Sequence, residues 1–298
     1  MYGPALIIAA YLMWGFFPLY FKQMDKVPAL DILMFRTLFT LVSVLPMAFL
    51  CGKGRELLRQ LKTPRNLGML FVNALLVSTN WLIFILLVNN NHTLQASLGY
   101  YINPLLTVLF ALIFFRERFG KLQWVSIGIA TVGVLIFAVG VGTFPWGALA
   151  VATTFGLYGV MKKICPTDSL TSLTVETLLL MPFVFLYIVC NDSVRSVWQI
   201  DPWQFLWLFG CGVLTGFTLL LYGAGALRVK LSTLGICQYI TPTGQFLTAV
   251  LVFREPMSTP QWYCFGLIWI ALLLFTIDSL RDEKTKSTYK TVESDGKR

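Results

Sequence analysis

Residues 67–88, LGMLFVNALLVSTNWLIFILLV, carry no charged side chain. A helix needs about 20 predominantly apolar residues to cross the hydrocarbon core of a bilayer, and this stretch is long enough. Apolar and polar residues do not alternate along it, as they would in a strand of a membrane barrel. The stretch therefore predicts a membrane-spanning helix, in which the backbone hydrogen bonds close within the segment.

The composition of the whole chain extends this interpretation. Of 298 residues, 57% are hydrophobic and 12% are charged, against about 45–50% and about 25% in soluble globular domains. The mean hydropathy is +0.73. So few charges cannot cover a water-exposed surface, which excludes a cytosolic enzyme, a disordered chain and a secreted disulfide scaffold. We expect an all-α integral membrane protein surrounded by the lipid bilayer.

Charge clusters and Gly, Pro and Asn residues divide the chain into ten apolar segments. At about 20 residues each, ten spanning helices use roughly two thirds of the chain and leave short connections. The charged residues from Arg281 onward predict a disordered tail. The ten expected spans lie near residues 4–21, 32–51, 67–88, 94–115, 122–140, 145–161, 170–190, 204–226, 232–253 and 260–279.

The distribution of Lys and Arg predicts the orientation in the membrane. If the connection at 53–65 is cytoplasmic, alternation places eighteen of the 23 basic residues inside and four outside, with Arg36 inside a span. Because basic residues concentrate in cytoplasmic loops, we expect both termini in the cytoplasm. The same bias explains the net charge of +9. No basic patch is interleaved with exposed aromatic residues, so no nucleic-acid partner is expected.

Motifs for other kinds of chemistry are absent from the sequence. The six cysteines stand in apolar stretches, and none forms a C-x-x-C pair or lies beside the single histidine, His92. We therefore expect no metal site, no disulfide framework and no cofactor. Without a Walker A, G-x-S-x-G or H-E-x-x-H motif, neither ATP-driven transport nor an enzyme activity is indicated.

The two halves of the chain repeat each other, with an offset of 138 residues over most of the match and about 141 near the start of each half. Each half holds five expected spans, and because five is odd the second half is inverted relative to the first. The expected architecture is ten transmembrane helices as two inverted five-helix repeats, 1–141 and 142–279, followed by the tail at 280–298. The matched residues are Tyr101, Ile102 and Pro104 with Tyr239, Ile240 and Pro242, and Pro4, Gly15 and Lys22 with Pro145, Gly156 and Lys163.

A polar helix face lies where an inverted repeat is expected to bind its substrate, near the bilayer midplane. Tyr100, Asn103 and Thr107 are spaced by three and four residues and therefore share one face of the fourth span. Pro104 frees a backbone carbonyl one turn earlier. Such a face lines a cavity or, as the alternative, joins packed helices by hydrogen bonds. The repeat counterparts of the three residues are Gln238, Thr241 and Gln245.

Further polar and aromatic residues belong to the same expected pathway. Asn73 and Asn80 lie seven residues apart on one face of the third span, and a carboxamide facing hydrocarbon would cost several kcal/mol. Trp14 and Tyr158, on the first span of each half, are candidate aromatic walls. Core packing or a membrane-interface belt would explain these two residues equally well. The candidate pathway is completed by Trp81, Tyr101 and Tyr239.

Arg36 and Glu176 are charged residues inside expected spans. Each costs about 2.5–3.5 kcal/mol at a helix centre, so a functional or pairing role is the default hypothesis. They lie 140 residues apart, close to the repeat offset, and inversion brings them in from opposite membrane faces. We expect Arg36 to serve the outer half of the pathway and Glu176 the inner half. A direct salt bridge and snorkelling of each charge are the alternatives.

Several motifs resemble the RarD branch of the EamA-type drug/metabolite transporters, and the resemblance covers nearly the whole chain up to the tail. It implies ten helices as two inverted repeats in the bacterial inner membrane, with export or facilitated movement of small organic solutes. The substrates of this branch are poorly defined, so the resemblance specifies the fold better than the cargo. The motifs are NWLIF at 80–84, ASLGYYINP at 96–104, RERF at 116–119, QW at 123–124, LSTLG at 231–235 and QYITPT at 238–243.

The combined interpretation is a secondary transporter that works by alternating access. Arg36 is the only basic residue well inside a span. Phosphate binding calls for several such donors, so we expect a neutral, zwitterionic or aromatic solute. Proton antiport through Glu176 and uncoupled downhill transport both stay open. A membrane receptor or assembly partner that transports nothing is the alternative from another class, and the sequence leaves a homodimer open.

Overall fold

The computed structural model describes residues 3–115, 120–165, 167–191, 202–226 and 237–295, and within these ranges it contains helices and no strands. Among the described residues, eight helices are long and apolar enough to cross a membrane. This confirms the predicted all-helical membrane protein. The eight are α1 (Gly3–Lys22), α2 (Ala29–Leu50), α4 (Pro64–Asn89), α5 (Thr93–Phe115), α6 (Lys121–Val141), α8 (Ser169–Cys190), α10 (Pro202–Ala226) and α13 (Thr259–Asp295).

Two other helices coincide with expected spans without reaching the same length or apolarity. α7 (Trp146–Ile164) has 19 residues, but Thr and Gly residues and the terminal Lys162 and Lys163 lower its hydropathy. α12 (Ile240–Leu247) continues directly into a π-helix, η1 (Thr248–Val252), so the helical run there is short. The first part of the expected span at 232–253 lies outside the described residues. Ten crossings therefore stay a prediction.

The connection between the second and third expected spans contains a short helix, α3 (Gly54–Lys62), which was expected as a plain loop. Its Arg, Glu, Leu, Gln and Lys residues are all good helix formers. Leu57 is buried, whereas Arg55, Arg59 and Lys62 are exposed. Apolar runs do not reveal this helix, because its charged residues leave no such run and suggest a loop instead.

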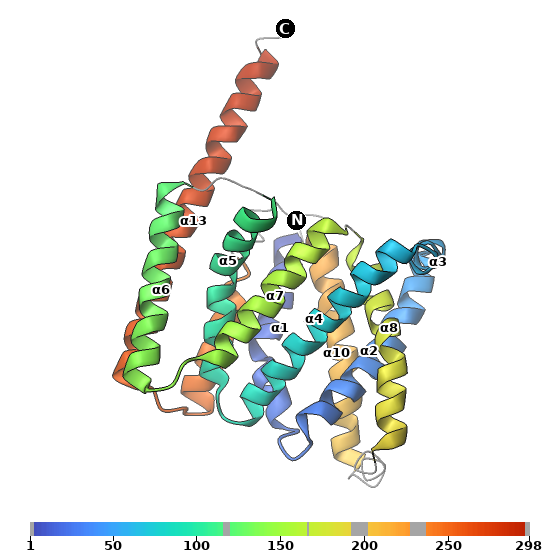
Figure 1. The fold of residues 1–298 in the computed structure, drawn as a ribbon. Helices are drawn as coiled ribbons and strands as arrows, with labels where there is room; N and C mark the ends of the chain where they lie inside the picture. Colours follow the sequence, from blue (N-terminus) through green and yellow to red (C-terminus); the bar gives the residue numbers. More distant parts are fainter. Residues whose placement is uncertain (1–2, 116–119, 166, 192–201, 227–236, 296–298) are drawn as a thin grey trace. The chain divides into compact units, whose positions relative to one another are not determined.

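The chain divides into two compact units, and each takes segments from both halves of the sequence. Unit 1 comprises Met1–Asn103 and Gly147–Glu255, and unit 2 comprises Pro104–Trp146 and Pro256–Arg298. In unit 1, α1 and α2 pack against α10, α2 packs against α8, and α1 packs against α12 (Figure 1). The core of unit 1 includes Phe17, Phe21, Met24, Ile32, Phe35, Phe84, Ile85 and Leu208.

Helices α1 and α12 approach each other most closely through a pair of glycines. A Cβ on Gly244 would lie 2.9 Å from the Gly15 Cα, and a Cβ on Gly15 would lie 3.2 Å from the Gly244 Cα. Small residues allow this kind of backbone approach in membrane proteins, where van der Waals packing drives helix association. The pair fixes α12, with its polar residues, against α1.

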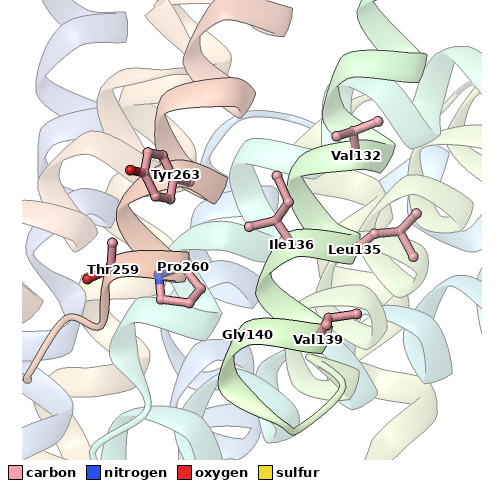
Figure 2. A pocket seen from close by; sticks show the side chains of 8 residues that line it. All are labelled: Val132, Leu135, Ile136, Val139, Gly140, Thr259, Pro260 and Tyr263. Carbon is pink, nitrogen blue, oxygen red and sulfur yellow. The ribbon is translucent and has the colours of Figure 1, made fainter.

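In unit 2, α6 and α13 pack lengthwise against each other. A groove of about 490 Å³ between them is lined by apolar side chains, including Val132, Leu135 and Tyr263 (Figure 2). Val139 at its edge is 83% exposed. An apolar surface of this kind is compatible with contact with lipid.

The C-terminal tail differs from the prediction of disorder after residue 279. Helix α13 continues to Asp295 and extends well beyond the end of α6 in Figure 1. The sequence from 267 to 295 contains no Gly or Pro. It also places Asp282 four residues before Lys286, a spacing that stabilises helices. The high charge density that suggested disorder is therefore compatible with a helix.

Candidate functional site

Arg36 lies on α2 inside a cage of aromatic rings. Its guanidinium carbon is 4.1 Å from the centre of the Trp81 ring, 5.4 Å from that of Phe21 and 5.9 Å from that of Phe17. Its Nε donates a hydrogen bond to the Thr215 hydroxyl oxygen at 3.2 Å. The residue is 3% exposed. No carboxylate in the described ranges lies within ion-pair distance of it.

Glu176, on α8, is also buried, but unlike Arg36 it has a partner of opposite charge, and both of its carboxylate oxygens accept hydrogen bonds. Its Oε1 accepts hydrogen bonds from Lys162 Nζ at 2.7 Å and from the Ser172 hydroxyl at 2.6 Å. Its Oε2 accepts one from the Tyr158 hydroxyl at 3.2 Å. Lys162 also donates to Ser172 and lies 4.9 Å from the centre of the Tyr158 ring. The ion pair with Lys162 neutralises the carboxylate.

Of the alternatives for the two charges, the structure speaks against a direct salt bridge between them. Glu176 pairs with Lys162 rather than with Arg36, and Arg36 packs against aromatic rings rather than against a carboxylate. Lys162 sits in the last turn of α7, where a cation is also stabilised by the helix dipole. Sequence analysis missed it because the sixth expected span, 145–161, ends one residue before Lys162 and leaves it in the following loop.

A row of aromatic rings connects the Arg36 cage to the Glu176 cluster. Starting from Phe21 in the cage, successive ring centres lie 5.9, 5.9, 5.8 and 6.0 Å apart. These are edge-to-face or tilted contacts in the usual range for aromatic pairs. The row ends at Tyr158, which contacts both members of the buried ion pair. We call this set the aromatic row: Phe21, Phe84, Tyr100, Phe155 and Tyr158.

Asn80 holds the middle of the aromatic row in place. Its Nδ2 donates to the Val151 carbonyl at 2.9 Å and to the Thr154 hydroxyl at 3.0 Å, both on α7. Its Oδ1 accepts a hydrogen bond from the Tyr100 hydroxyl at 3.0 Å. Asn80 is fully buried, so the predicted polar face of this helix points into the protein. Its carboxamide fixes the orientation of the Tyr100 ring.

Asn73 lies on the same face of α4, seven residues before Asn80, and is also fully buried. Neither its Oδ1 nor its Nδ2 has a hydrogen-bond partner among the described residues. Gln245 Oε1 and Thr248 Oγ1, in α12 and η1, share this condition. Unpaired buried polar atoms carry a desolvation cost of about 1–3 kcal/mol each. They are the positions where a water molecule or a polar solute would be stabilised.

Asn103 and Thr241 bond to helix backbones. Asn103 Nδ2 donates to the Ala152 carbonyl at 3.0 Å, and the Thr241 hydroxyl donates to the Tyr11 carbonyl at 3.0 Å. Thr241 is the repeat counterpart of Asn103, and Ala152 is the counterpart of Tyr11 under the offset of 141. Each half thus donates an equivalent hydrogen bond to a backbone carbonyl of the other half. Both side chains join packed helices, which was the alternative to lining a cavity.

The other predicted pathway residues are distributed around this framework. Trp14 packs with Tyr11 and Tyr222, with ring centres 5.6 Å apart in each case. The Tyr101 hydroxyl hydrogen-bonds the Thr243 hydroxyl at 2.8 Å. Gln238 and Tyr239 are half-buried just before α12. Thr107 is exposed, on the part of α5 that belongs to unit 2.

Glu255 is a structural residue that was not among the predicted site residues. Its two carboxylate oxygens accept hydrogen bonds from the backbone amides of Thr93 at 2.8 Å and Leu94 at 2.9 Å. A carboxylate at this position satisfies the free amides of the first turn of α5 and complements its dipole. Its repeat counterpart, Glu117, lies outside the described residues, as do the motifs at 116–119 and 231–235.

These features define a multi-pass helical membrane protein with charged and aromatic side chains gathered between its helices. The family model of the EamA-like transporter family matches residues 1–139 and 145–277. The chain belongs to this family, and it is a membrane transporter rather than an enzyme.

The relatives agree with the RarD-type assignment. An "Uncharacterized transporter" of Vibrio cholerae is 43% identical over 94% of this chain and 93% of its own length. "Protein RarD" of Escherichia coli K12 is 37% identical over 96% and 97%. A solved structure described only as "Crystal structure of protein" has a TM-score of 0.62 at 17% identity, covering 94% of this chain and 98% of its own. At that identity it supports the fold alone. The resemblance stated from the motifs is confirmed.

Proposed function

We propose that this transporter is a secondary carrier that moves small neutral, zwitterionic or aromatic organic solutes across the bacterial inner membrane by alternating access. The pathway follows the aromatic row, from the Arg36 cage to the Glu176–Lys162 pair. The observation that carries this proposal is the continuity of the row: each ring contacts the next, and a buried charge stands at either end.

Phe21 and Phe84 are buried, but the exposure of the other three rings of the row supports a role in solute contact. Tyr100 and Tyr158 are half-buried and Phe155 is 39% exposed, although Arg36 and Glu176 beside them are buried. Ring faces provide a broad apolar surface and bind aromatic and organic bodies with little demand on hydrogen-bond geometry. Of the two cations at the row, Lys162 is neutralised by Glu176. One unpaired guanidinium is too little positive charge for a phosphorylated solute.

Two inverted five-helix repeats, 1–141 and 142–279, would supply the alternating movement. The two family matches, 1–139 and 145–277, support this division. So do two equivalent hydrogen bonds between the halves, from Asn103 to the Ala152 carbonyl and from Thr241 to the Tyr11 carbonyl. With ten crossings and the observed distribution of Lys and Arg, both termini are cytoplasmic in this proposal.

Transport is proposed to be uncoupled and downhill, with proton antiport through Glu176 as the second candidate. Lys162, Ser172 and Tyr158 all hydrogen-bond the Glu176 carboxylate, which supports a structural role for this group. Liposome uptake with and without a pH gradient separates the two. A gradient that drives uptake in the wild type and fails in Glu176→Gln would replace the uncoupled mechanism with antiport.

The function is tested by comparing the metabolites of cells with and without the protein, since this needs no assumption about the solute. We expect a small set of organic solutes to differ, and their flux into liposomes to be reduced by Asn80→Leu, Asn103→Leu and Gln238→Leu without loss of expression. Unchanged metabolites together with no measurable flux would favour the alternative, a receptor or assembly partner.

A further inference from the structure

The guanidinium of Arg36 has most of its hydrogen-bonding capacity unused. An Arg side chain offers five N–H donors in a planar fork. Within the described ranges, Arg36 makes one hydrogen bond, through Nε to Thr215, and no ion pair. The titratable groups close enough to interact with its charge are Cys211 and Tyr100, and neither is a carboxylate. The charge is buried and lacks a counter-ion.

Aromatic rings stabilise this charge without satisfying its donors. The Trp81 ring lies 4.1 Å from the guanidinium carbon, and the Phe21 and Phe17 rings lie within 6 Å. Their negative faces attract a cation, and the attraction strengthens when the cation is desolvated. A ring face does not replace a carboxylate as a bidentate hydrogen-bond acceptor, however. The cage keeps a guanidinium buried and leaves the terminal nitrogens free of a protein acceptor in the described structure.

Comparison with Glu176 shows what a satisfied buried charge looks like in this protein. That carboxylate receives a cation and two hydroxyl donors. A buried charge without a partner of opposite charge lowers the stability of a protein. An unpaired guanidinium is therefore expected where an anion from outside the protein binds and serves as that partner. The terminal N–H groups of Arg match the two oxygens of a carboxylate, which makes a carboxylate the fitting anion.

We propose that Arg36 is the subsite for a carboxylate group of the transported solute. This inference rests on the proposed function and narrows its solute class to organic carboxylates, including zwitterions, whose apolar or aromatic body lies along the aromatic row. The Phe21 ring belongs to both the cage and the row, so a carboxylate on Arg36 brings the body of the solute directly onto Phe84 and Tyr100. Arg36 is the element of the pathway that distinguishes an acid from its neutral analogue.

A pair of isosteric probes tests the subsite. The full chain is placed in phosphatidylcholine nanodiscs, and the Kd values of 3-phenylpropionate and 3-phenylpropionamide are measured by titration calorimetry. We expect the carboxylate to bind the wild type at least about tenfold more tightly, a difference of about 1.4 kcal/mol. Arg36→Gln should abolish the difference, and Arg36→Lys, which keeps the charge and loses the fork, should keep part of it. Arg59→Gln, at an arginine whose side chain is 71% exposed on α3, is the matched control and should keep all of it.

Each outcome bears on the subsite separately from transport. Equal Kd values for the two probes on the wild type overturn the inference, and this comparison needs no variant to fold. A preference that survives in Arg36→Gln also overturns it. Loss of carboxylate binding in nanodiscs containing phosphatidylglycerol would show that Arg36 holds a lipid phosphate instead. Flux of both probes into liposomes is measured in parallel. If the carboxylate binds more tightly than the amide but neither probe is transported, the proposed function is contradicted and the subsite is retained. If the probes are transported but bind equally well, the subsite is contradicted and the proposed function is retained.

Discussion

Arg36 and Glu176 are two buried charges in the same compact unit, and the protein stabilises them in different ways. Glu176 is neutralised by Lys162 and held by two hydroxyl groups. Arg36 is surrounded by rings and has one neutral hydrogen-bond partner. A paired charge behaves as part of the framework, because removing its partner leaves an isolated ion in a medium of low dielectric constant. An unpaired charge can be replaced by an apolar residue with a smaller loss of stability, and it is available to bind a solute.

Removing Lys162 should produce the largest loss of stability. Lys162→Met leaves the Glu176 carboxylate buried without its cation, and we expect the free energy of unfolding to fall by about 3–5 kcal/mol. Unfolding of the detergent-solubilised protein with increasing SDS measures this. In the double variant Lys162→Met/Glu176→Leu neither charge remains, so most of the stability should return. A loss below about 1 kcal/mol in the single variant would show that the pair is not part of the framework.

The comparison between paired and unpaired groups also applies to the two buried asparagines of α4. Asn80→Leu removes two hydrogen bonds to α7 and leaves the Tyr100 hydroxyl without its acceptor, at an expected cost of about 1–3 kcal/mol. Asn73→Leu is the matched control, since the Asn73 carboxamide has no partner among the described residues. We expect it to be neutral or stabilising in the same SDS titration. Equal losses in the two variants would contradict the distinction.

The sequence predicted the helices and the buried charges, but not the partners of those charges. Spanning helices follow from the length of apolar runs, and a charge inside such a run, like Arg36 or Glu176, is visible in the sequence itself. The contacts of Arg36 with Trp81 and Phe21 depend on how three helices are rotated about their axes, and residue spacing does not determine this. Lys162 was missed because a helix end is uncertain by a few residues. α3 was missed because its charged residues form a helix without an apolar run.

Asp168, at the start of the helix that carries Glu176, forms an ion pair that is more exposed to solvent than the pair of Glu176 with Lys162. Asp168 caps the N-terminus of α8 by accepting a hydrogen bond from the Thr171 amide at 3.2 Å, and it lies 3.6 Å from Lys53 Nζ. Burial alone would raise the pKa of Asp168, but the hydrogen bonds from Thr171 and the charge of Lys53 outweigh it and hold the pKa below its ordinary value. The folded state therefore favours the ionised form.

Asp168→Ala should cost about 0.5–2 kcal/mol at neutral pH, most of it from the lost cap. Because the pKa is lower in the folded state, the contribution of the carboxylate is complete above the ordinary Asp value and disappears as the pH falls through the lowered folded-state value. Wild type and variant should therefore converge in stability at acidic pH. The Lys53 part should also weaken with added salt, because both side chains are exposed. A difference that persists unchanged in acid would contradict the role of the carboxylate.

Substitution of Arg36 should have the smallest effect on stability and the greatest effect on transport. Arg36→Met removes the guanidinium and replaces it with a shorter, unbranched apolar side chain. Thr215 keeps its own hydrogen bond to the Cys211 carbonyl at 2.8 Å. No buried polar group loses its last partner, so the free energy of unfolding should change by less than about 1 kcal/mol. Flux of a carboxylate probe into liposomes should nevertheless fall by at least about tenfold, the loss expected for one charge-assisted contact. The flux of its amide analogue should be retained. If Arg36→Met instead destabilises the protein as severely as Lys162→Met does, both buried charges belong to the framework, because the cage of Trp81, Phe21 and Phe17 would then be built around the cation rather than around a solute.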